Sequence, residues 1–397
     1  MYYLMAVSTI ANNKNPLPGF LTYGLGIIGI GLVVFFGGEV IRNIDNLKGK
    51  AGISVQALNS DADIYINDKF VGKTPYESND IKPGQNKISL KTGDRQYQTT
   101  VNFLSNTNNL LHVVGIVRDL GVSDTFSSGQ DFWFEKDNSG NVLRVVSEPD
   151  QAKVYLDGAE IGTTPFLTGN ISDGDYELKV TLPGYETQTT RINVKEGYVL
   201  NASVKLFPML VPQKVSALTD SGNFYDLSTD SDIVAASTQD WAKAVVYWNK
   251  TRGINIENVG DNKAQVFDLY LDYKGNIFDA DGNPISTPEA MAAVKDFKKG
   301  AYLGRTSDNG LSSQAKSALT TLLGSASAIG GKQAKINATP TGWLRVRSDA
   351  SLAGTEVTKV DTGGSYLVLE QKTGWVKIKV SDTVEGWVSS DYVTLSQ

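Results

Sequence analysis

Residues 152–165 decide the fold of the first half of the chain and read Ala-Lys-Val-Tyr-Leu-Asp-Gly-Ala-Glu-Ile-Gly-Thr-Thr-Pro. Within them Val154 and Leu156 alternate with Tyr155, which is the period of a half-buried β-strand. The apolar side chains of such a strand point to one face of a sheet, and the polar ones point to the other. The stretch therefore begins with a strand of an antiparallel sheet.

The rest of the stretch predicts a tight hairpin. Asp157-Gly158 favours a two-residue turn, because both residues tolerate positive φ. The returning strand reaches Gly162, where we expect positive φ or a close backbone approach. Thr164-Pro165 then ends the pairing, since proline has no N–H to donate to the β-ladder.

The same pattern occurs ninety residues earlier in the chain. Residues 53–100 align without a gap to residues 143–190. Matches at scattered positions of mechanical importance indicate duplication of one folding unit. The earlier counterparts of the motif residues include Gly72, Thr74 and Pro75.

The later copy resembles the PEGA family of bacterial surface modules. The resemblance rests on Pro149, Ala152, residues 154–158, Ile161-Gly162, Thr164-Pro165, Gly174 and Gly184-Tyr185. The earlier copy departs from this pattern, with Asn59 in place of Pro149 and Asp94-Arg95 in place of Gly184-Tyr185. The resemblance implies two small β-sandwich-like modules, residues 53–141 and 142–208, that act outside the membrane as interaction or scaffold units without an active site.

An uncharged stretch, residues 20–38, precedes the repeats. As a helix, nineteen residues reach about 28 Å, close to the hydrocarbon thickness of a bilayer. We therefore expect a transmembrane helix over residues 20–41, between a short tail (1–19) and a juxtamembrane linker (42–52). The alternatives are a cleaved signal peptide and a buried glycine-rich helix.

The orientation of this anchor depends on two opposing signals. Lys14 precedes the span, and Arg42, Lys48 and Lys50 follow it, which slightly favours a cytoplasmic C-terminal side. The modules that the chain resembles belong to extracytoplasmic proteins. We give the second signal more weight and expect a single-pass cell-membrane protein with its C-terminal domains extracytoplasmic.

The C-terminal end, residues 336–397, resembles the bacterial SH3 domain. The resemblance rests on an opening strand and two tryptophan strands, namely Leu344-Arg345-Val346-Arg347-Ser348, Gly374-Trp375-Val376-Lys377-Ile378 and Gly386-Trp387-Val388-Ser389-Ser390. It implies an SH3-like β-barrel that binds peptidoglycan or another wall component.

The aromatic residues of this domain are the candidate ligand-binding residues. Trp375 and Trp387 begin strands, and we expect them to fill the barrel core or shield its rim. Trp343 precedes the first predicted strand and is the leading candidate for stacking on a ligand. Aromatic faces beside an arginine suit a sugar–peptide polymer, which adds Arg345, Tyr366 and Tyr392 as the remaining candidates.

Residues 209–324 resemble no family and predict a mixed α+β domain, followed by a linker over 325–335. The expected elements are helices over 239–250, 287–298 and 311–323 and a hairpin over 266–279.

The composition excludes several kinds of chemistry. The chain has no cysteine and one histidine, His112, which excludes disulfides and thiolate sites and removes most catalytic triads. Asp279-Ala-Asp-Gly-Asn283 suggests a calcium loop, but the EF-hand positions for glycine and the last carboxylate hold Pro284 and Ala290. A polar turn explains it better, so we expect no metal and no cofactor. The net charge of −6 does not suggest a nucleic-acid partner.

Together these patterns predict a multidomain, mainly β envelope protein that is not an enzyme. It would contact the lipid bilayer through residues 20–41, and peptidoglycan or another envelope polymer through its modules. Residues 209–330 leave two alternatives open. They could be the catalytic domain of a wall-modifying enzyme, or they could bind a protein partner in an assembly.

Overall fold

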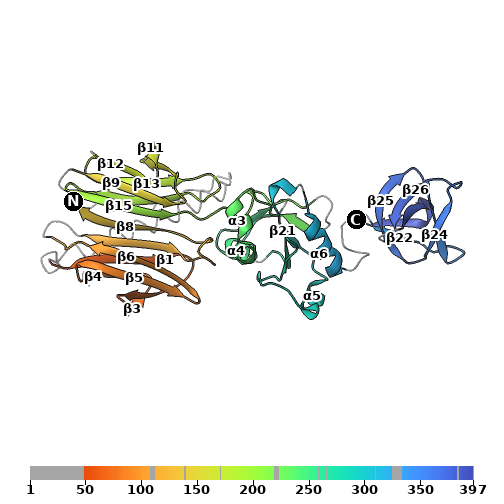
Figure 1. Cartoon of the computed structure of the whole chain (residues 1–397), viewed down its shortest axis with the longest axis horizontal. Helices are drawn as coiled ribbons and strands as arrows, with labels where there is room; N and C mark the ends of the chain where they lie inside the picture. The colour runs from red at the N-terminus through yellow and green to blue at the C-terminus, as the bar shows by residue number, and fades with distance from the viewer. Residues whose placement is uncertain are drawn as a thin grey trace, which may run out of the picture. The chain divides into compact units, whose positions relative to one another are not determined.

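The computed structural model describes residues 49–107, 112–137, 140–169, 171–218, 223–257, 259–264, 266–308, 310–323, 333–381 and 384–396. The chain is mainly β and divides into two compact units, one ending at residue 206 and one containing residues 120–127 and 207–397 (Figure 1). The predicted transmembrane helix, residues 20–41, lies outside the described residues. Within the described ranges, no helix is both long and apolar enough to cross a bilayer.

The first unit contains the two copies of the repeat and one additional strand. The earlier copy forms β1 (Ala51–Ala57), β2 (Asp63–Ile66), β3 (Lys69–Lys73), β4 (Tyr76–Ile81), β5 (Gly84–Thr92), β6 (Arg95–Phe103) and β7 (Val113–Asp119). The later copy forms β9 (Val142–Glu148), β10 (Lys153–Leu156), β11 (Ala159–Thr163), β12 (Phe166–Gly169), β13 (Gly174–Thr181), β14 (Gln188–Val194) and β15 (Tyr198–Lys205). The additional strand, β8 (Ser128–Lys136), lies between them in the chain.

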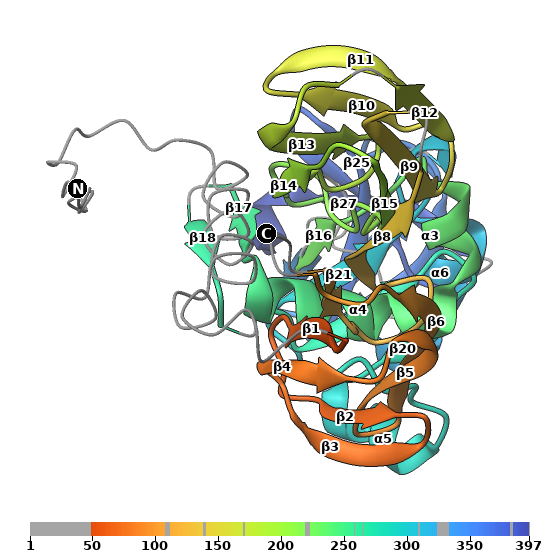
Figure 2. The ribbon, with the colours of Figure 1, turned by 90° about the vertical axis from the view of Figure 1, so that its left-hand side faces the viewer.

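Both copies contribute to one central sheet. Its seven strands run in the order β12-β9-β15-β8-β7-β1-β4, so β8 joins the strands of one copy to those of the other. Each copy also forms a four-stranded sheet of its own, β3-β2-β5-β6 in the earlier copy and β11-β10-β13-β14 in the later one (Figure 2). The two predicted modules therefore share a sheet, because β8 pairs with both.

Alternate residues of β8 face different cores. Phe132 and Phe134 pack in the hydrophobic core of the later copy. Asp131 points the other way and pairs in register with Ile116 of β7, a buried residue of the earlier copy. Since successive side chains of a strand point to opposite faces, the two four-stranded sheets cover opposite faces of the central sheet.

The Thr-Pro motif lies where the chain crosses between sheets. Thr164 follows β11 of the small sheet and precedes β12 of the central sheet. Its backbone N–H donates to the carbonyl of Ala152 at 2.8 Å, and its hydroxyl accepts from the Ala152 N–H at 3.0 Å. Thr74 and Ala62 form the same two bonds in the earlier copy, both at 2.9 Å. The motif thus satisfies a buried backbone group at each crossing.

The hairpin turns have the geometry that their sequences require. In the later copy φ is 46° at Asp157 and 83° at Gly158, and Asn67 and Asp68 of the earlier copy also have positive φ. The Asp157 carboxylate accepts from the N–H of Glu177 on β13 at 2.7 Å. Each turn is therefore held to the neighbouring strand as well as closed by its own backbone.

Gly162 is required for a reason that differs from the expected one. Its φ is not in the left-handed region. A Cβ atom at this position would instead lie 2.5 Å from the ring of Phe166. In the earlier copy the ring of Tyr76 would lie 3.1 Å from a Cβ at Gly72. An aromatic side chain just beyond the Thr-Pro crossing occupies the space that a larger residue would need.

The middle of the chain forms a sheet covered on both faces. Strands β16 (Phe224–Asp226), β21 (Gly300–Leu303), β19 (Leu269–Asp272) and β20 (Ile277–Phe278) lie in that order. The helices are α3 (Asp232–Ala236), α4 (Thr238–Thr251), α5 (Pro288–Val294) and α6 (Ser313–Leu323), and a small hairpin is formed by β17 (Ile254–Ile256) and β18 (Gly260–Asn262). Tyr270 packs in one core with α4, whereas its neighbours Leu269 and Leu271 pack in a second core with α6.

Two of the middle helices are shorter than expected. Helix α5 ends at Val294 rather than at 298, because the N–H groups of Lys298 and Lys299 donate to Asp268 at 2.9 and 3.1 Å. Helix α6 begins at Ser313 rather than at 311, since the Ser312 hydroxyl caps it by accepting from the Ala315 N–H at 3.0 Å.

The C-terminal domain is a seven-stranded barrel-like sheet in the order β24-β23-β27-β26-β25-β22-β28. Its strands are β22 (Gln333–Ile336), β23 (Trp343–Arg347), β24 (Glu356–Asp361), β25 (Ser365–Lys372), β26 (Trp375–Lys379), β27 (Glu385–Ser389) and β28 (Val393–Ser396). Strand β22 begins inside the predicted linker, 325–335, and pairs with both β25 and β28. Its buried residues, Ala334 and Ile336, belong to the barrel core.

Candidate ligand-binding surface of the C-terminal barrel

The strand register places Trp387 on the outer face of the barrel. The core residues Val376 and Val388 are paired across β26 and β27, and Trp387 is paired with Lys377 one position further along. Adjacent pairs in a ladder point to opposite faces, so Trp387 points away from the core. Of the two expected positions, filling the barrel core or shielding it, the register of Trp387 fits the second. Trp387 is 5% exposed, and Lys372 lies over its ring with Nζ 4.6 Å from the ring centroid.

Trp375 has the same orientation. It precedes the core residue Val376 and pairs with Lys372 of β25. Trp375 is half-buried on the outer face, and thus shields the barrel from outside. Trp375 and Trp387 each follow a glycine and precede an inward-pointing valine. Because neighbouring residues of a strand point to opposite faces, this alternation in the sequence indicates that both tryptophans point outward.

Trp343 is the first residue of β23 and not, as expected, a residue before the strand. It pairs with Asp361 of β24. The hydroxyls of Thr339 and Thr341 donate to its backbone carbonyl at 2.9 and 3.0 Å. These bonds fix the backbone at the strand start, while the indole lies half-buried on the outer face beside Arg345.

Two cations lie over the indole of Trp343. Nζ of Lys359 is 4.0 Å from the ring centroid and Cζ of Arg345 is 5.3 Å from it. Glu356 holds both cations, with its carboxylate 2.7 Å from Nε of Arg345 and 3.7 Å from Nζ of Lys359. The three charged side chains are 39–51% exposed. Of this group, Lys359 and Glu356 were not among the predicted site residues.

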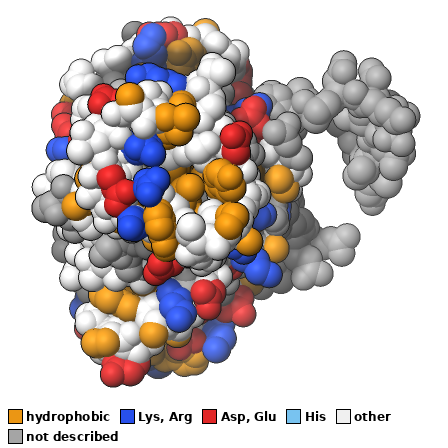
Figure 3. Space-filling model, turned by 90° about the vertical axis from the view of Figure 1, so that its right-hand side faces the viewer, with side chains coloured by type: hydrophobic (Ala, Val, Ile, Leu, Met, Phe, Trp, Pro, Cys, Tyr) orange, Lys and Arg blue, Asp and Glu red, His pale blue; other side chains and the backbone are white. Residues whose placement is uncertain are grey.

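The outer face continues from β23 to β27. Arg347 lies on the same face of β23 as Trp343 and Arg345, and it pairs with Trp387. Lys377 pairs with Trp387 from the other side and contacts Glu385. On this outer face the half-buried Trp343 and the almost fully buried Trp387 alternate with basic side chains. On the face of the molecule that Figure 3 shows, hydrophobic side chains lie beside Lys and Arg side chains.

The two tyrosines of the predicted site do not belong to this surface. Tyr366 pairs with the core residue Ala334 and packs against the barrel core. Burial, with a contribution from Asp361, raises the pKa of its phenol. Tyr392 lies in the short 3₁₀ helix Ser390–Tyr392 and is 40% exposed. Within the described residues, no hydrogen bond or ring contact joins Tyr392 to Trp343.

The polar clusters of the middle domain stabilise turns through hydrogen bonds to the backbone. The buried carboxylate of Asp272 accepts from the N–H groups of Lys274 and Asn276 at 2.9 and 2.8 Å. Asp279 repeats this arrangement with Asp281 and Asn283 at 3.0 and 2.8 Å. In the stretch that suggested a calcium loop, the Asp279 carboxylate therefore holds the backbone of a turn. Over the described ranges, no group of acidic residues or histidine is arranged to hold a metal ion.

His112 is buried and has no polar partner for its ring. The imidazole lies 4.7 Å from the ring of Tyr198 and 5.9 Å from that of Phe134, measured between centroids. Neither ring nitrogen forms a hydrogen bond within the described residues. Burial, together with Lys136, lowers the pKa of His112 to about 4. These surroundings are those of a packing residue.

Comparison with protein families identifies both kinds of module. A PEGA domain model matches residues 51–113 and again residues 141–209. A bacterial SH3 domain model matches residues 342–394. Comparison with curated proteins finds no match. The chain thus carries two PEGA domains and a C-terminal bacterial SH3 domain, as the sequence patterns predicted.

Proposed function

We propose that this chain is a non-catalytic envelope protein that binds a cell-wall polymer through its C-terminal barrel. The observation that carries the proposal is the position of Trp343, which lies on the outer face with Lys359 and Arg345 over its ring. The two PEGA domains support a role at the cell surface, where such modules act as scaffolds.

The chemistry of this surface suits a polymer of sugars and peptides. A sugar ring presents C–H groups that pack on an indole face once Lys359 and Arg345 move aside. The displaced cations then pair with carboxylates of the polymer instead of Glu356. Exposed ion pairs are worth about 0–1 kcal/mol, so exchanging one carboxylate for another costs little.

The proposal includes a membrane anchor at residues 20–41, with the following domains outside the cytoplasm. An anchor fixes one end of the chain near the wall, which raises the effective concentration of the barrel and makes a weak contact persistent. Protease added to intact cells should then remove the domains beyond about residue 50. Protection of the barrel until the membrane is lysed would contradict this orientation.

Wall binding is tested with the full chain in detergent and with purified cell wall. Trp343→Ala should lower the affinity for the wall, measured by co-sedimentation, about thirtyfold, because losing a central aromatic contact costs about 2 kcal/mol. Leu352→Ala is the matched control, since Leu352 is an exposed apolar residue of the same domain at 80% exposure. Circular dichroism checks that both variants fold. Equal binding by folded Trp343→Ala and wild type would place the site elsewhere.

A further inference from the structure

The outer face of the first small sheet carries an exposed aromatic pair. Tyr65 of β2 and Phe70 of β3 are paired in register, with ring centroids 5.7 Å apart in an edge-to-face arrangement. Phe70 is 51% exposed. Both side chains point away from the core, because the next pair along the strands contains the buried residue Ile64.

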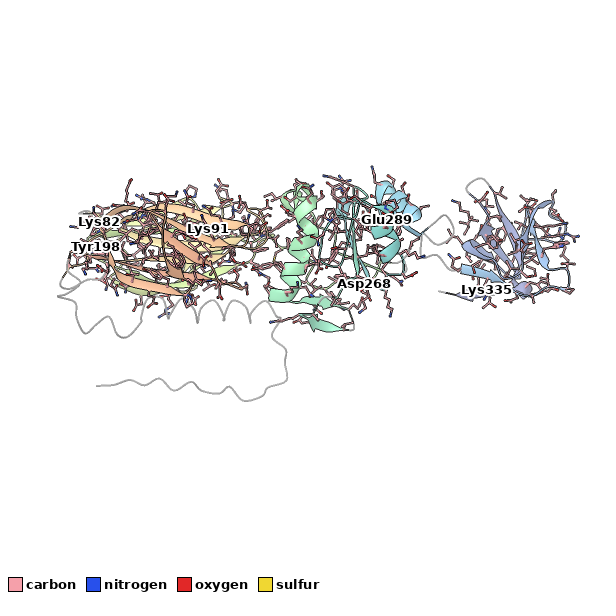
Figure 4. All side chains as sticks on the ribbon, turned by 90° about the horizontal axis from the view of Figure 1, so that it is seen from below. Lys82, Lys91, Tyr198, Asp268, Glu289 and Lys335 are labelled. Atoms are coloured by element: carbon pink, nitrogen blue, oxygen red, sulfur yellow. The ribbon has the colours of Figure 1, made fainter. Side chains whose placement is uncertain are left out.

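Polar and charged side chains surround the aromatic pair, and the acidic one on β2, Asp63, forms an ion pair with Lys73 at 3.4 Å. Lys91 of β5 places Nζ 4.7 Å from the centroid of the Tyr65 ring, and it forms no ion pair within the described residues. Gln96 and Gln98 follow on β6, on the same face, and are hydrogen-bonded to each other at 3.3 Å. Figure 4 labels Lys91 on this sheet. Apart from Tyr65 and Phe70, the register places no apolar side chain of β2, β5 or β6 on this face.

The later copy lacks this platform at the equivalent position. Glu160 stands where the earlier copy has Phe70, and it pairs in register with Tyr155. Its carboxylate accepts from Nζ of Lys153 at 3.0 Å and from the Tyr155 hydroxyl at 3.2 Å. The groups that would contact a ligand are thus engaged with one another in the later copy, whereas Phe70 is exposed in the earlier copy.

We propose that the outer face of the sheet β3-β2-β5-β6 binds an anionic sugar polymer. A pyranose ring packs on Phe70 and Tyr65, the glutamines exchange hydrogen bonds with its hydroxyls, and Lys91 pairs with a carboxylate or phosphate. Two rings bordered by amides and an ammonium group suit a sugar. A protein interface needs about 800 Å² per partner with an apolar centre, and the register places no aliphatic side chain of β2, β5 or β6 on this face to supply one. The site is separate from the barrel surface and does not depend on it.

The test uses the full chain carrying Trp343→Ala, so that binding by the barrel is reduced about thirtyfold. Calorimetric titration measures the affinity for two polymers. An oligogalacturonate supplies pyranose rings with carboxylates, and a phosphorylated mannan fragment supplies pyranose rings with phosphates. Phe70→Glu, which introduces the residue of the later copy, should weaken binding about tenfold or more. Leu167→Glu is the matched control, because Leu167 is an exposed apolar residue of the later copy at 62% exposure.

A second variant tests the charge. The methyl ester of the oligogalacturonate keeps the sugar rings and removes the negative charges. The chain in which Phe70 and Lys91 are unchanged should therefore bind the ester less tightly than the acid. Lys91→Gln should abolish this difference, and added salt should reduce it. Failure of both anionic polymers to bind, or equal binding by Phe70→Glu, would overturn the proposal. So would self-association that Phe70→Glu abolishes, since the platform would then join two protein copies. None of these outcomes bears on wall binding by the barrel, which is measured separately with Trp343 intact.

Discussion

The two repeats fold alike but hold the shared strand β8 in different ways. In the later copy Phe132 and Phe134 pack in the hydrophobic core, and Gln130 donates to the side chain of Gln188 at 2.9 Å. In the earlier copy β8 contributes Asp131, which forms a buried ion pair with Arg118. The position equivalent to Arg118 in the later copy is Val204, which lies in the core.

On the side of β8 that faces the earlier copy, Asp131, Arg118 and Tyr97 form a network in which each side chain is hydrogen-bonded to the other two. Arg118 contacts both carboxylate oxygens of Asp131, at 3.1 and 2.5 Å, and donates to the Tyr97 hydroxyl at 2.6 Å. Tyr97 in turn donates to Asp131, and its ring lies 3.8 Å from Cζ of Arg118. Burial and the charge of Asp131 raise the pKa of Tyr97. One backbone arrangement therefore accepts either an apolar or an ionic contact, provided that the buried charges are fully paired.

The largest expected effect comes from breaking this network. Asp131→Ala leaves Arg118 buried without a counter-charge and should cost about 3–5 kcal/mol of unfolding free energy. Gln188→Ala, on the other side of β8, removes a neutral bond and should cost about 1–3 kcal/mol. Urea unfolding of the full chain, followed through the transition of the first unit, measures both. A smaller loss for Asp131→Ala than for Gln188→Ala would contradict this ranking.

A second comparison concerns His112 and Tyr198, which occupy equivalent positions in the two copies and contact each other. Burial lowers the pKa of His112 to about 4 in the folded state. The depressed pKa means that protonation of His112 favours the unfolded state. The free energy of unfolding is therefore undiminished above the unfolded-state pKa of about 6.5 and decreases as the pH falls towards 4. Between pH 7 and pH 5 the loss should be about 2 kcal/mol.

His112→Phe should remove this part of the acid sensitivity. Denaturation midpoints at pH 7 and pH 5 for wild type and variant measure the difference. Tyr198→Phe serves as the control, because it changes the same contact without removing a group that titrates in this range. If the variant and the wild type lose equal stability between the two pH values, His112 does not titrate as described.

The smallest expected effect distinguishes the two sheet crossings. Thr164 bonds to the hydroxyl of Ser147 at 2.6 Å in addition to the N–H of Ala152, whereas among the described residues the Thr74 hydroxyl has the bond from Ala62 alone. Thr164→Val should therefore cost more than Thr74→Val, by about 1 kcal/mol for the additional bond. Thermal or urea unfolding of the two variants measures the difference. Equal losses would mean that the bond to Ser147 contributes nothing to stability.

The sequence predicted those parts of the fold that depend on local pattern. The hairpin at Asp157-Gly158 follows from strand period and turn chemistry, and the earlier copy follows from the ninety-residue offset. The barrel strands were also visible, but the sequence left open whether Trp387 fills the core or shields the barrel. The register decides for the shielding position, because the valine that follows Trp387 points inward.

The partners of Trp343 were not predicted because they lie on another strand. Lys359 is sixteen residues away in the chain, and it reaches the indole only because β24 pairs with β23 in one register. A shift of one residue would turn Lys359 to the other face. The same reason explains why Tyr366 was misplaced, since only its pairing with Ala334 turns it towards the core.

The amino-acid sequence by itself determined that the chain contains a duplicated β-module and a C-terminal SH3-like domain. Repeats, turn residues and strand periods are local properties, so each segment carries its own signal. The tertiary structure alone decided that β8 joins the two copies, that Asp131 meets Arg118 and that the tryptophans of the barrel lie outside. These features depend on pairing and register between strands far apart in the chain, and the same local pattern is compatible with more than one such pairing.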